Sequence, residues 1–185
     1  MISAPTRRYD YVRVPTEIYR RSFATIRSEA DLSRLPEDMR SVAVRMIHAC
    51  GDVNLVNDLS LHPQLVSAAW TALAAGAVIF TDTQMLAAGI TRRRLPADNE
   101  VRCLVDDPQA RELAERWGTT RSAAAVSLWV DRLAGAVVGI GNAPTALCHL
   151  LELIADGAPR PAAIIGIPVG FVGSAESKIA LVENP

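Results

Sequence analysis

His48 is the residue in this sequence best suited to proton transfer. It lies near the end of a stretch whose apolar residues recur at the spacing of an amphipathic helix. The predicted apolar stripe consists of Met39, Val42, Ala43, Met46, Ile47 and Cys50. At about 100° per residue, His48 lies opposite the middle of that stripe, on the side of Val44 and Arg45. The pattern predicts that His48 faces water, a cleft or a partner, while the core takes the other face.

Two interpretations of His48 follow from its position. An exposed polar residue is most often an ordinary solvated one, and the pattern alone favours that interpretation. The alternative is a proton-transfer residue, because an unperturbed imidazole titrates near neutrality. His62 and His149 have no metal-ligand spacing with His48 or with each other, so no metal site is expected.

Two glycine-rich segments, residues 141–145 and 166–173, follow predicted strands and lead into predicted helices. Their backbone N–H groups are candidates to hold an anion at a helix N-terminus. A tight turn that needs glycine for packing is an equally good interpretation. Neither segment has the G-x-G-x-x-G or the Walker pattern, so a nucleotide site is not supported.

Two further segments place positive charge where an anionic ligand would fit. Residues 118–122 combine Arg121 with small hydroxyl residues, including Ser122, at a predicted helix start, which suits a carboxylate or phosphate. Plain helix capping by Thr120 is the alternative. Thr91 begins a run of three arginines that either meets a polyanionic ligand or forms a solvated basic turn.

The composition restricts the classes of function. The chain has 185 residues, 50% of them hydrophobic and 21% charged, which is typical of a globular domain. A net charge of −1 and short apolar runs exclude nucleic acid and membrane as expected partners. Three scattered cysteines without disulfide or zinc spacing are consistent with a reducing cytoplasm, and none lies in a motif that would make it a nucleophile. Of 19 basic residues only Lys178 is a lysine, which reflects either codon composition or bidentate binding of carboxylates by arginine.

Strand and helix patterns alternate along most of the chain. Residues 1–14 form a predicted N-terminal arm, and residues 15–185 form a single predicted α/β domain. The predicted strands are residues 77–81, 101–105, 136–140 and 162–166. The predicted helices begin near Pro15, Pro36, Pro63, Thr83, Pro108, Thr120, Pro144 and Ser174, with Thr16, Asp107 and Thr120 as N-caps. This alternation predicts a three-layer, flavodoxin-like fold, with a mostly parallel sheet and helices on both faces. Ligands of such sheets bind outside the carboxyl ends of the strands.

Several sequence blocks, in order and at the expected spacing, resemble the precorrin-8X methylmutase family from residue 9 to residue 184. These blocks are residues 9–11, 18–23, 45–51, 91–96, 99–101, 120–124, 140–147 and 168–178. The Gly-Asn-Ala-Pro-Thr and Pro-Val-Gly-Phe-Val blocks are specific in combination, although each alone would mean little.

The resemblance implies an isomerase of cobalamin biosynthesis. Members move a methyl group from C11 to C12 of the corrinoid ring, formally a [1,5]-sigmatropic shift, and convert precorrin-8X to hydrogenobyrinate without a cofactor. The family's histidine corresponds to His48, which would protonate the ring as a general acid, and Ser22 matches a substrate-binding position. The family is dimeric and holds its substrate between subunits.

From the resemblance and the anion-ready segments together, we expect a set of substrate contacts around His48. They are Ser22, Arg20, Arg21, Thr91, Arg121, Ser122, Gly141, Asn142, Ala143, Thr145, Pro168, Val169 and Gly170. The arginines suit the carboxylates of the substrate. Pro168, Val169 and Phe171 would form apolar walls for a large flat ring.

Three questions stay open at this point. The family usually continues past the position of Pro185 with a further strand and helix, so an edge of the sheet is expected to be missing. A non-catalytic corrinoid-binding or carrier protein on the same fold is therefore an alternative. Without the resemblance, the pattern would indicate a flavodoxin-like anion or nucleotide binder. The sequence does not tell whether the substrate is precorrin-8X or its cobalt-containing form, cobalt-precorrin-8.

Overall fold

The computed structural model describes residues 2–184. Met1 and Pro185, the outer bounds of the predicted arm and domain, lie outside the described residues. Internal contacts divide the chain into two compact units, Met1–Pro63 and Gln64–Pro185, and each unit is described by itself. The single domain over residues 15–185 stays a prediction.

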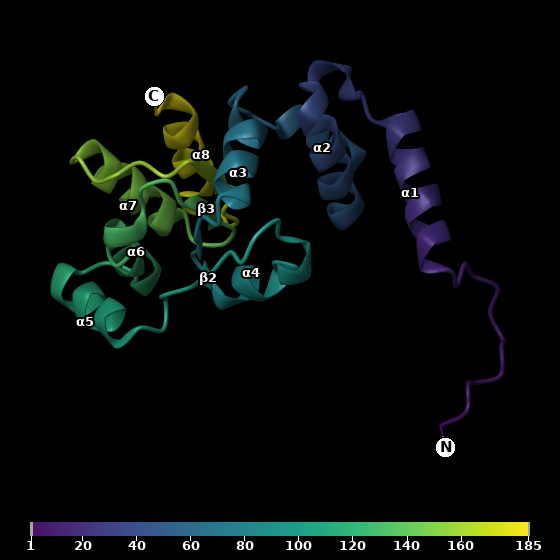
Figure 1. Cartoon of the computed structure of the whole chain (residues 1–185), viewed down its shortest axis with the longest axis horizontal. Helices are drawn as coiled ribbons and strands as arrows, with labels where there is room; N and C mark the ends of the chain where they lie inside the picture. The colour runs from purple at the N-terminus through teal and green to yellow at the C-terminus, as the bar shows by residue number, and fades with distance from the viewer. Residues whose placement is uncertain (1, 185) are drawn as a thin grey trace. The chain divides into compact units, whose positions relative to one another are not determined.

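The first unit is helical. Residues 2–14 contain no helix or strand, and they lead into α1 (Pro15–Glu29), η1 (Leu32–Arg34), α2 (Glu37–Cys50) and η2 (Val53–Asp58) (Figure 1). The predicted N-cap Thr16 is wrong, because the N-cap of α1 is Val14 and Pro15 already occupies the first helical position. Proline suits that position because its fixed φ is helical and its missing N–H would be unbonded there anyway.

The core of the first unit corrects the predicted stripe of α2. Ala43, Val44 and Ile47 are fully buried there, whereas Val42 is 37% exposed and Cys50 lies on the surface. Because α1 and the two short helices cover α2 from different sides, its buried face is rotated towards Val44, which the stripe had placed beside His48. The helix ends at Gly51, which has φ 73° and whose N–H bonds to the carbonyl of Ile47 at 2.7 Å.

The second unit contains a fully parallel sheet of four strands. They are β1 (Ile79–Thr81), β2 (Val101–Arg102), β3 (Val137–Ile140) and β4 (Ala163–Gly166), in the spatial order β2-β1-β3-β4. Ile79 is in register with Val101 on one side and with Val137 on the other. All four predicted strands are confirmed in position, but they are shorter than predicted, and β2 ends at Arg102 rather than at residue 105.

The helices of this unit are α3 (Leu65–Ala74), α4 (Gln84–Gly89), η3 (Arg92–Arg94), α5 (Pro108–Trp117), α6 (Arg121–Ser127), η4 (Val130–Arg132), α7 (Pro144–Ala155) and α8 (Ser174–Glu183). Residues 120–133 do not form one continuous helix, because α6 ends at Ser127 and a tighter turn follows. That turn places Trp129, which is fully buried, in a stacked arrangement on Phe80 of β1, with ring centroids 5.1 Å apart.

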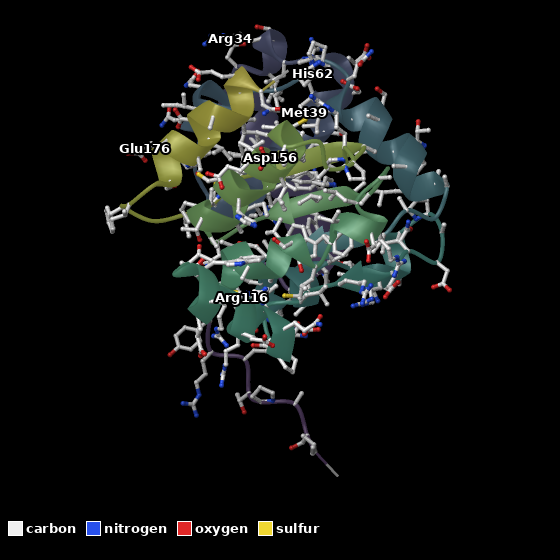
Figure 2. The ribbon with its side chains drawn as sticks, turned by 90° about the vertical axis from the view of Figure 1, so that its left-hand side faces the viewer. Arg34, Met39, His62, Arg116, Asp156 and Glu176 are labelled. Carbon is white, nitrogen blue, oxygen red and sulfur yellow. The ribbon has the colours of Figure 1, made fainter. Side chains whose placement is uncertain are left out.

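The two faces of the sheet carry separate apolar cores, which confirms the three-layer α/β fold. Alternate side chains of a strand point to opposite faces, so Phe80 packs with α6 and α7 while Ile79 packs with α3. Figure 1 shows α3 on one side of the strands and α6 and α7 on the other, and Figure 2 shows side chains filling the space between these layers. All three residues of β1 are buried, as predicted for a strand covered on both faces.

A buried amide braces the end of the sheet where β1 begins. Asn99 is 5% exposed, and its Nδ2 donates to the carbonyls of Leu73 and Ala77, both at 2.9 Å. These bonds join the end of α3 to the entry of β1. Loss of both would remove this donor from two backbone carbonyls, of which that of Leu73 also accepts the N–H of Gly76 at 3.0 Å.

We therefore expect Asn99→Ala to lower the free energy of unfolding by about 1–3 kcal/mol, because buried acceptors lose their partner. Urea unfolding followed by circular dichroism measures this change. Asp98→Ala, at the exposed neighbouring position, is the control and should stay within about 0.5 kcal/mol of the parent. Equal stability of Asn99→Ala and the parent would show that the bracing bonds contribute nothing.

Candidate functional site

The predicted site residues fall in both units. His48, Ser22, Arg20 and Arg21 belong to the first unit, on α1 and α2. The second unit holds the others, namely Thr91, Arg121, Ser122, Gly141, Asn142, Ala143, Thr145, Pro168, Val169 and Gly170. Each group has its own geometry and its own chemistry.

His48 lies against α1 and is only half-buried. Ser22 Oγ lies 2.7 Å from His48 Nδ1, a hydrogen-bonding distance. The rings of Tyr19 and Phe23 flank the imidazole, with centroids 5.2 and 5.4 Å from its own. The prediction that His48 faces water, a cleft or a partner holds only in part, because α1 packs against one side of the half-buried ring.

The contacts of His48 distinguish its two ring nitrogens. Nδ1 is engaged by Ser22, whereas Nε2 has no hydrogen-bond partner among residues 2–184. In the protonated imidazole both nitrogens carry a proton, so Nδ1–H donates a hydrogen bond to Ser22 Oγ and Nε2–H is left for another acceptor. A histidine held in this way can donate the Nε2 proton to a bound molecule while Ser22 fixes the ring orientation.

Sequence reasoning assigned no role in the site to Tyr19 or Phe23. Both precede or follow Ser22 at spacings that put the three side chains on one face of α1, so helical periodicity applied to α1 would have found this group. The guanidinium carbons of Arg27 and Arg45 lie 5.7 and 5.6 Å from the centroid of Phe23. The surroundings of His48 are thus aromatic and positively charged.

Arg20 and Arg21 are already paired with a carboxylate of their own helix. Glu17 accepts two bonds from Arg20, at 2.7 and 2.6 Å, and one from Arg21 Nε at 2.6 Å. Hydrogen bonds from Arg20 and then Arg21 lower the pKa of Glu17 to about 2, and the same pairing raises the pKa of Arg20. A substrate carboxylate that used these arginines would have to replace Glu17.

The glycine-rich segment 141–145 does hold an anion, but that anion belongs to the protein. The Asp82 carboxylate accepts the N–H groups of Gly141 at 3.0 Å, Asn142 at 2.8 Å and Ala143 at 2.7 Å. Asp82 is 2% exposed. The hypothesis that these amides bind an external anion is therefore wrong, because Asp82 already uses them.

The segments around residues 118–122 and 141–145 meet at the carboxyl ends of the strands. Thr120 Oγ1 lies 2.7 Å from Thr145 Oγ1, and Thr120 also accepts the N–H of Ala123 at 3.1 Å, which confirms its capping role. Arg121 lies beside these hydroxyls and forms an exposed ion pair with Asp106 at 3.8 Å. The exposed Asn142 follows on the same segment as Thr145, and Ser122 is half-buried in the first turn of α6.

The second glycine-rich segment is held by side chains of α8. The carbonyl of Pro168 accepts Ser174 Oγ at 2.8 Å and Lys178 Nζ at 3.4 Å. Val169 and Phe171 are exposed, as apolar walls for a ligand would be, and Gly170 has a φ of 122° that favours glycine. Thr91 is exposed at the start of η3, and no hydrogen bond or ion pair within residues 2–184 links its side chain to the other site residues.

Other kinds of site find no support in the described residues. Within residues 2–184, no group of three or more His, Cys, Asp or Glu side chains is arranged to hold a metal ion. None of the described helices has the length and apolarity to cross a membrane. Burial raises the pKa of the Cys103 and Cys148 thiols, which disfavours a thiolate at either position.

Comparison with known proteins gives a consistent result. The sequence model of the precorrin-8X methylmutase family matches residues 17–185. The precorrin-8X methylmutase of Sinorhizobium sp is 60% identical over 176 residues, covering 95% of this chain and 84% of that protein. The precorrin-8X methylmutase of Pseudomonas aeruginosa is 54% identical over 175 residues, with coverage of 95% and 84%.

More distant relatives and a solved structure agree. The cobalt-precorrin-8 methylmutase of Priestia megaterium is 32% identical over 170 residues, covering 91% of this chain and 76% of that protein. The crystal structure of precorrin-8X methylmutase from Thermus thermophilus superposes with a TM-score of 0.82 at 40% identity, covering 92% of this chain and 82% of that chain.

The Ser22–His48 contact predicts a change in the imidazole itself. In Ser22→Ala the Nδ1 atom loses its partner, so the nitrogen chemical shifts of His48 should move and its tautomer equilibrium should change. Nitrogen-detected NMR of the imidazole measures this effect. Ser28→Ala, which removes an exposed hydroxyl of α1 that bonds only to the carbonyl of Thr25, should leave His48 unchanged. Identical His48 spectra in the parent and Ser22→Ala would rule out the bond.

Proposed function

The chain belongs to the precorrin-8X methylmutase family, and from that premise we propose that His48 is the general acid of an intramolecular methyl transfer. The enzyme is an isomerase of cobalamin biosynthesis. Its proposed substrate is precorrin-8X, and its product is hydrogenobyrinate. The observation that carries the assignment is the Ser22–His48 pair, which holds one ring nitrogen and leaves the other for the substrate.

The proposed reaction is balanced without any co-reactant. The imidazolium of His48 gives its Nε2 proton to the macrocycle, and the positive charge this creates favours migration of the methyl group. The bond from that methyl to C11 breaks as its bond to C12 forms, and the proton then returns to His48. Atoms and electrons are the same in substrate and product, so no cofactor takes part in this scheme.

Ser22 is proposed to act on His48 rather than only on the substrate. Its hydroxyl accepts a hydrogen bond from Nδ1–H of the imidazolium and so holds the ring in one orientation. Tyr19 and Phe23 restrict the ring further and offer aromatic surface to a flat macrocycle. Ser22 is therefore both a site residue, as the family resemblance implies, and the hydrogen-bond partner of the proposed general acid, His48.

The carboxylates of the substrate are proposed to meet arginine side chains. Arg121 is half-exposed and its ion pair with Asp106 is long, so a substrate carboxylate can compete for it. Arg20 and Arg21 would exchange Glu17 for a substrate carboxylate in the same way. Ser122, Asn142, Thr145 and the exposed Val169 complete the proposed contacts in the second unit.

We also propose a homodimer with substrate bound at its interface, and a cytoplasmic location. Exposed apolar side chains at Ile167, Val169 and Phe171 support an interface. Cys50, Cys103 and Cys148 are unpaired, which suits a reducing compartment. The carrier alternative is not favoured, because the relatives at 60% and 54% identity bear methylmutase names. A nucleotide binder is disfavoured because Asp82 uses the amides that would hold a phosphate.

His48→Ala should lower kcat for conversion of precorrin-8X by about 10²–10⁴-fold, the range expected for loss of a general acid. The change in visible absorption on conversion measures turnover, and binding of hydrogenobyrinate shows that the variant still takes ligand. A matched control is His149→Ala, because His149 is also half-buried and also lies against a serine, with Nε2 2.8 Å from Ser127 Oγ.

His149→Ala should keep the turnover of the parent. If folded His48→Ala turned over precorrin-8X at the parent rate, His48 would be removed from the mechanism. If the parent bound hydrogenobyrinate but did not convert precorrin-8X, the carrier alternative would replace the enzyme.

Arg121→Ala should raise KM for precorrin-8X and Kd for hydrogenobyrinate by about tenfold or more, because a charge-assisted hydrogen bond to a carboxylate is lost. The value of kcat should change much less, since Arg121 binds substrate and transition state alike. Arg116→Ala on α5, at the position labelled in Figure 2, is the control and should bind the product normally. An unchanged Kd in Arg121→Ala would exclude this arginine from the substrate contacts.

A further inference from the structure

Asp82 occupies the place in the fold where ligands of open parallel sheets bind. It directly follows β1, and its carboxylate crosses to the segment that follows β3. The chain leaves β1 for β2 on one side and reaches β3 on the other, so the carboxyl ends of β1 and β3 form the topological switch point. The mechanism proposed above makes no use of this buried acid.

The Asp82 carboxylate is held by backbone amides and not by a cation. It accepts three N–H groups at 2.7–3.0 Å, and no Lys, Arg or His side chain among residues 2–184 forms an ion pair with it. The positive end of the α7 dipole adds to these bonds, because Pro144 begins α7 directly after Ala143. A buried carboxylate is costly unless it is bonded, so any conformation of the segment that released Asp82 would be strongly disfavoured.

The three bonds to Asp82 engage the backbone of residues 141–143 and leave the polar side chains of segment 141–145 exposed. Asn142 and Thr145 are exposed, and the hydroxyl of Thr145 is bonded to Thr120. Behind the segment, a Cβ on Gly141 would lie 3.3 Å from Leu86 Cδ2, so α4 limits movement inward. Asp82, α4 and Thr120 thus each hold the segment at a different point.

We propose that Asp82 is a positioning residue for substrate binding. It holds residues 141–145 in one conformation, so that Asn142 and Thr145 are presented to the corrinoid. Its carboxylate also occupies the position at the start of α7 where an anion would bind, so that the substrate's carboxylates are directed to arginines such as Arg121 instead. The proposal rests on the function proposed above, and it concerns substrate recognition and not proton transfer.

Asp82→Ala tests this role, with Asn99→Ala as the matched control. Asn99 is likewise a buried polar residue of this unit that bonds backbone groups, but it lies where β1 begins and not where it ends. In Asp82→Ala, KM for precorrin-8X and Kd for hydrogenobyrinate should rise by about tenfold relative to Asn99→Ala, because the loop is released. The kcat of Asp82→Ala should stay within about threefold of that of Asn99→Ala, because the contacts of His48 are unchanged.

Formate provides a readout that a general loss of stability would not give. The three amides of Asp82→Ala are arranged for one carboxylate, so formate should raise the melting temperature of this variant and restore its affinity for hydrogenobyrinate. Formate should do neither for the parent or for Asn99→Ala. Asp82→Asn keeps the shape of the side chain, should lose affinity to a smaller extent, and serves as the test if Asp82→Ala does not fold.

The proposal is overturned if Asp82→Ala, or Asp82→Asn where the alanine variant is unfolded, binds hydrogenobyrinate as Asn99→Ala does. It is equally overturned if kcat falls as KM rises, as in a merely destabilised protein, and formate restores neither the melting temperature nor the affinity for hydrogenobyrinate. Failure of the proposed function looks different, because the parent itself would then not convert precorrin-8X. The formate-dependent melting shift of Asp82→Ala does not depend on turnover.

Discussion

The buried Asp82 carboxylate and its three backbone donors fix the part of the second unit where strands end and ligands can bind. β1 and β3 are neighbours in the sheet, but each is followed by a segment that must turn away from it. Asp82 accepts the N–H groups of Gly141, Asn142 and Ala143. These bonds link the segment after β1 to the segment after β3 and make one rigid edge of them. The start of α7, and through Thr145 the start of α6, are positioned from that edge.

The same interaction fits the proposed substrate, a polycarboxylate, better than it fits a phosphate ester. Free amides at a helix N-terminus attract any small anion, without regard to the rest of the molecule. An internal carboxylate at that place removes the attraction, which agrees with the proposal that side chains such as Arg121 recognise the charges of the substrate. Guanidinium groups bind carboxylates with a defined geometry, so the proposed arginine contacts would orient the ring.

The fold could be predicted from the sequence because it follows from local patterns. Short apolar runs between helical patterns predict parallel strands, and Asp107 and Thr120 cap their helices through bonds within three residues. The site was harder to predict from the sequence, because its main contacts join residues that are far apart in the chain. Ser22 and His48 are 26 residues apart, and Asp82 and Gly141 are 59 apart. A glycine-rich segment looks the same in sequence whether an outside anion or a distant aspartate uses its amides.

The strong preference for arginine acquires a physical meaning once its partners are known. Arg20 and Arg21 share Glu17, Arg121 lies near Asp106, and Arg132 bonds Glu100 at 2.7 Å. These pairs are solvent-exposed, and exposed ion pairs contribute little to stability. In the proposed binding mode, an incoming carboxylate exchanges one acid for another at a guanidinium that is already paired. For a ligand with many carboxylates, this exchange lowers the entropic cost of each contact. The proposed exchange would also make binding sensitive to ionic strength, because the ion pairs that it replaces are between exposed charges.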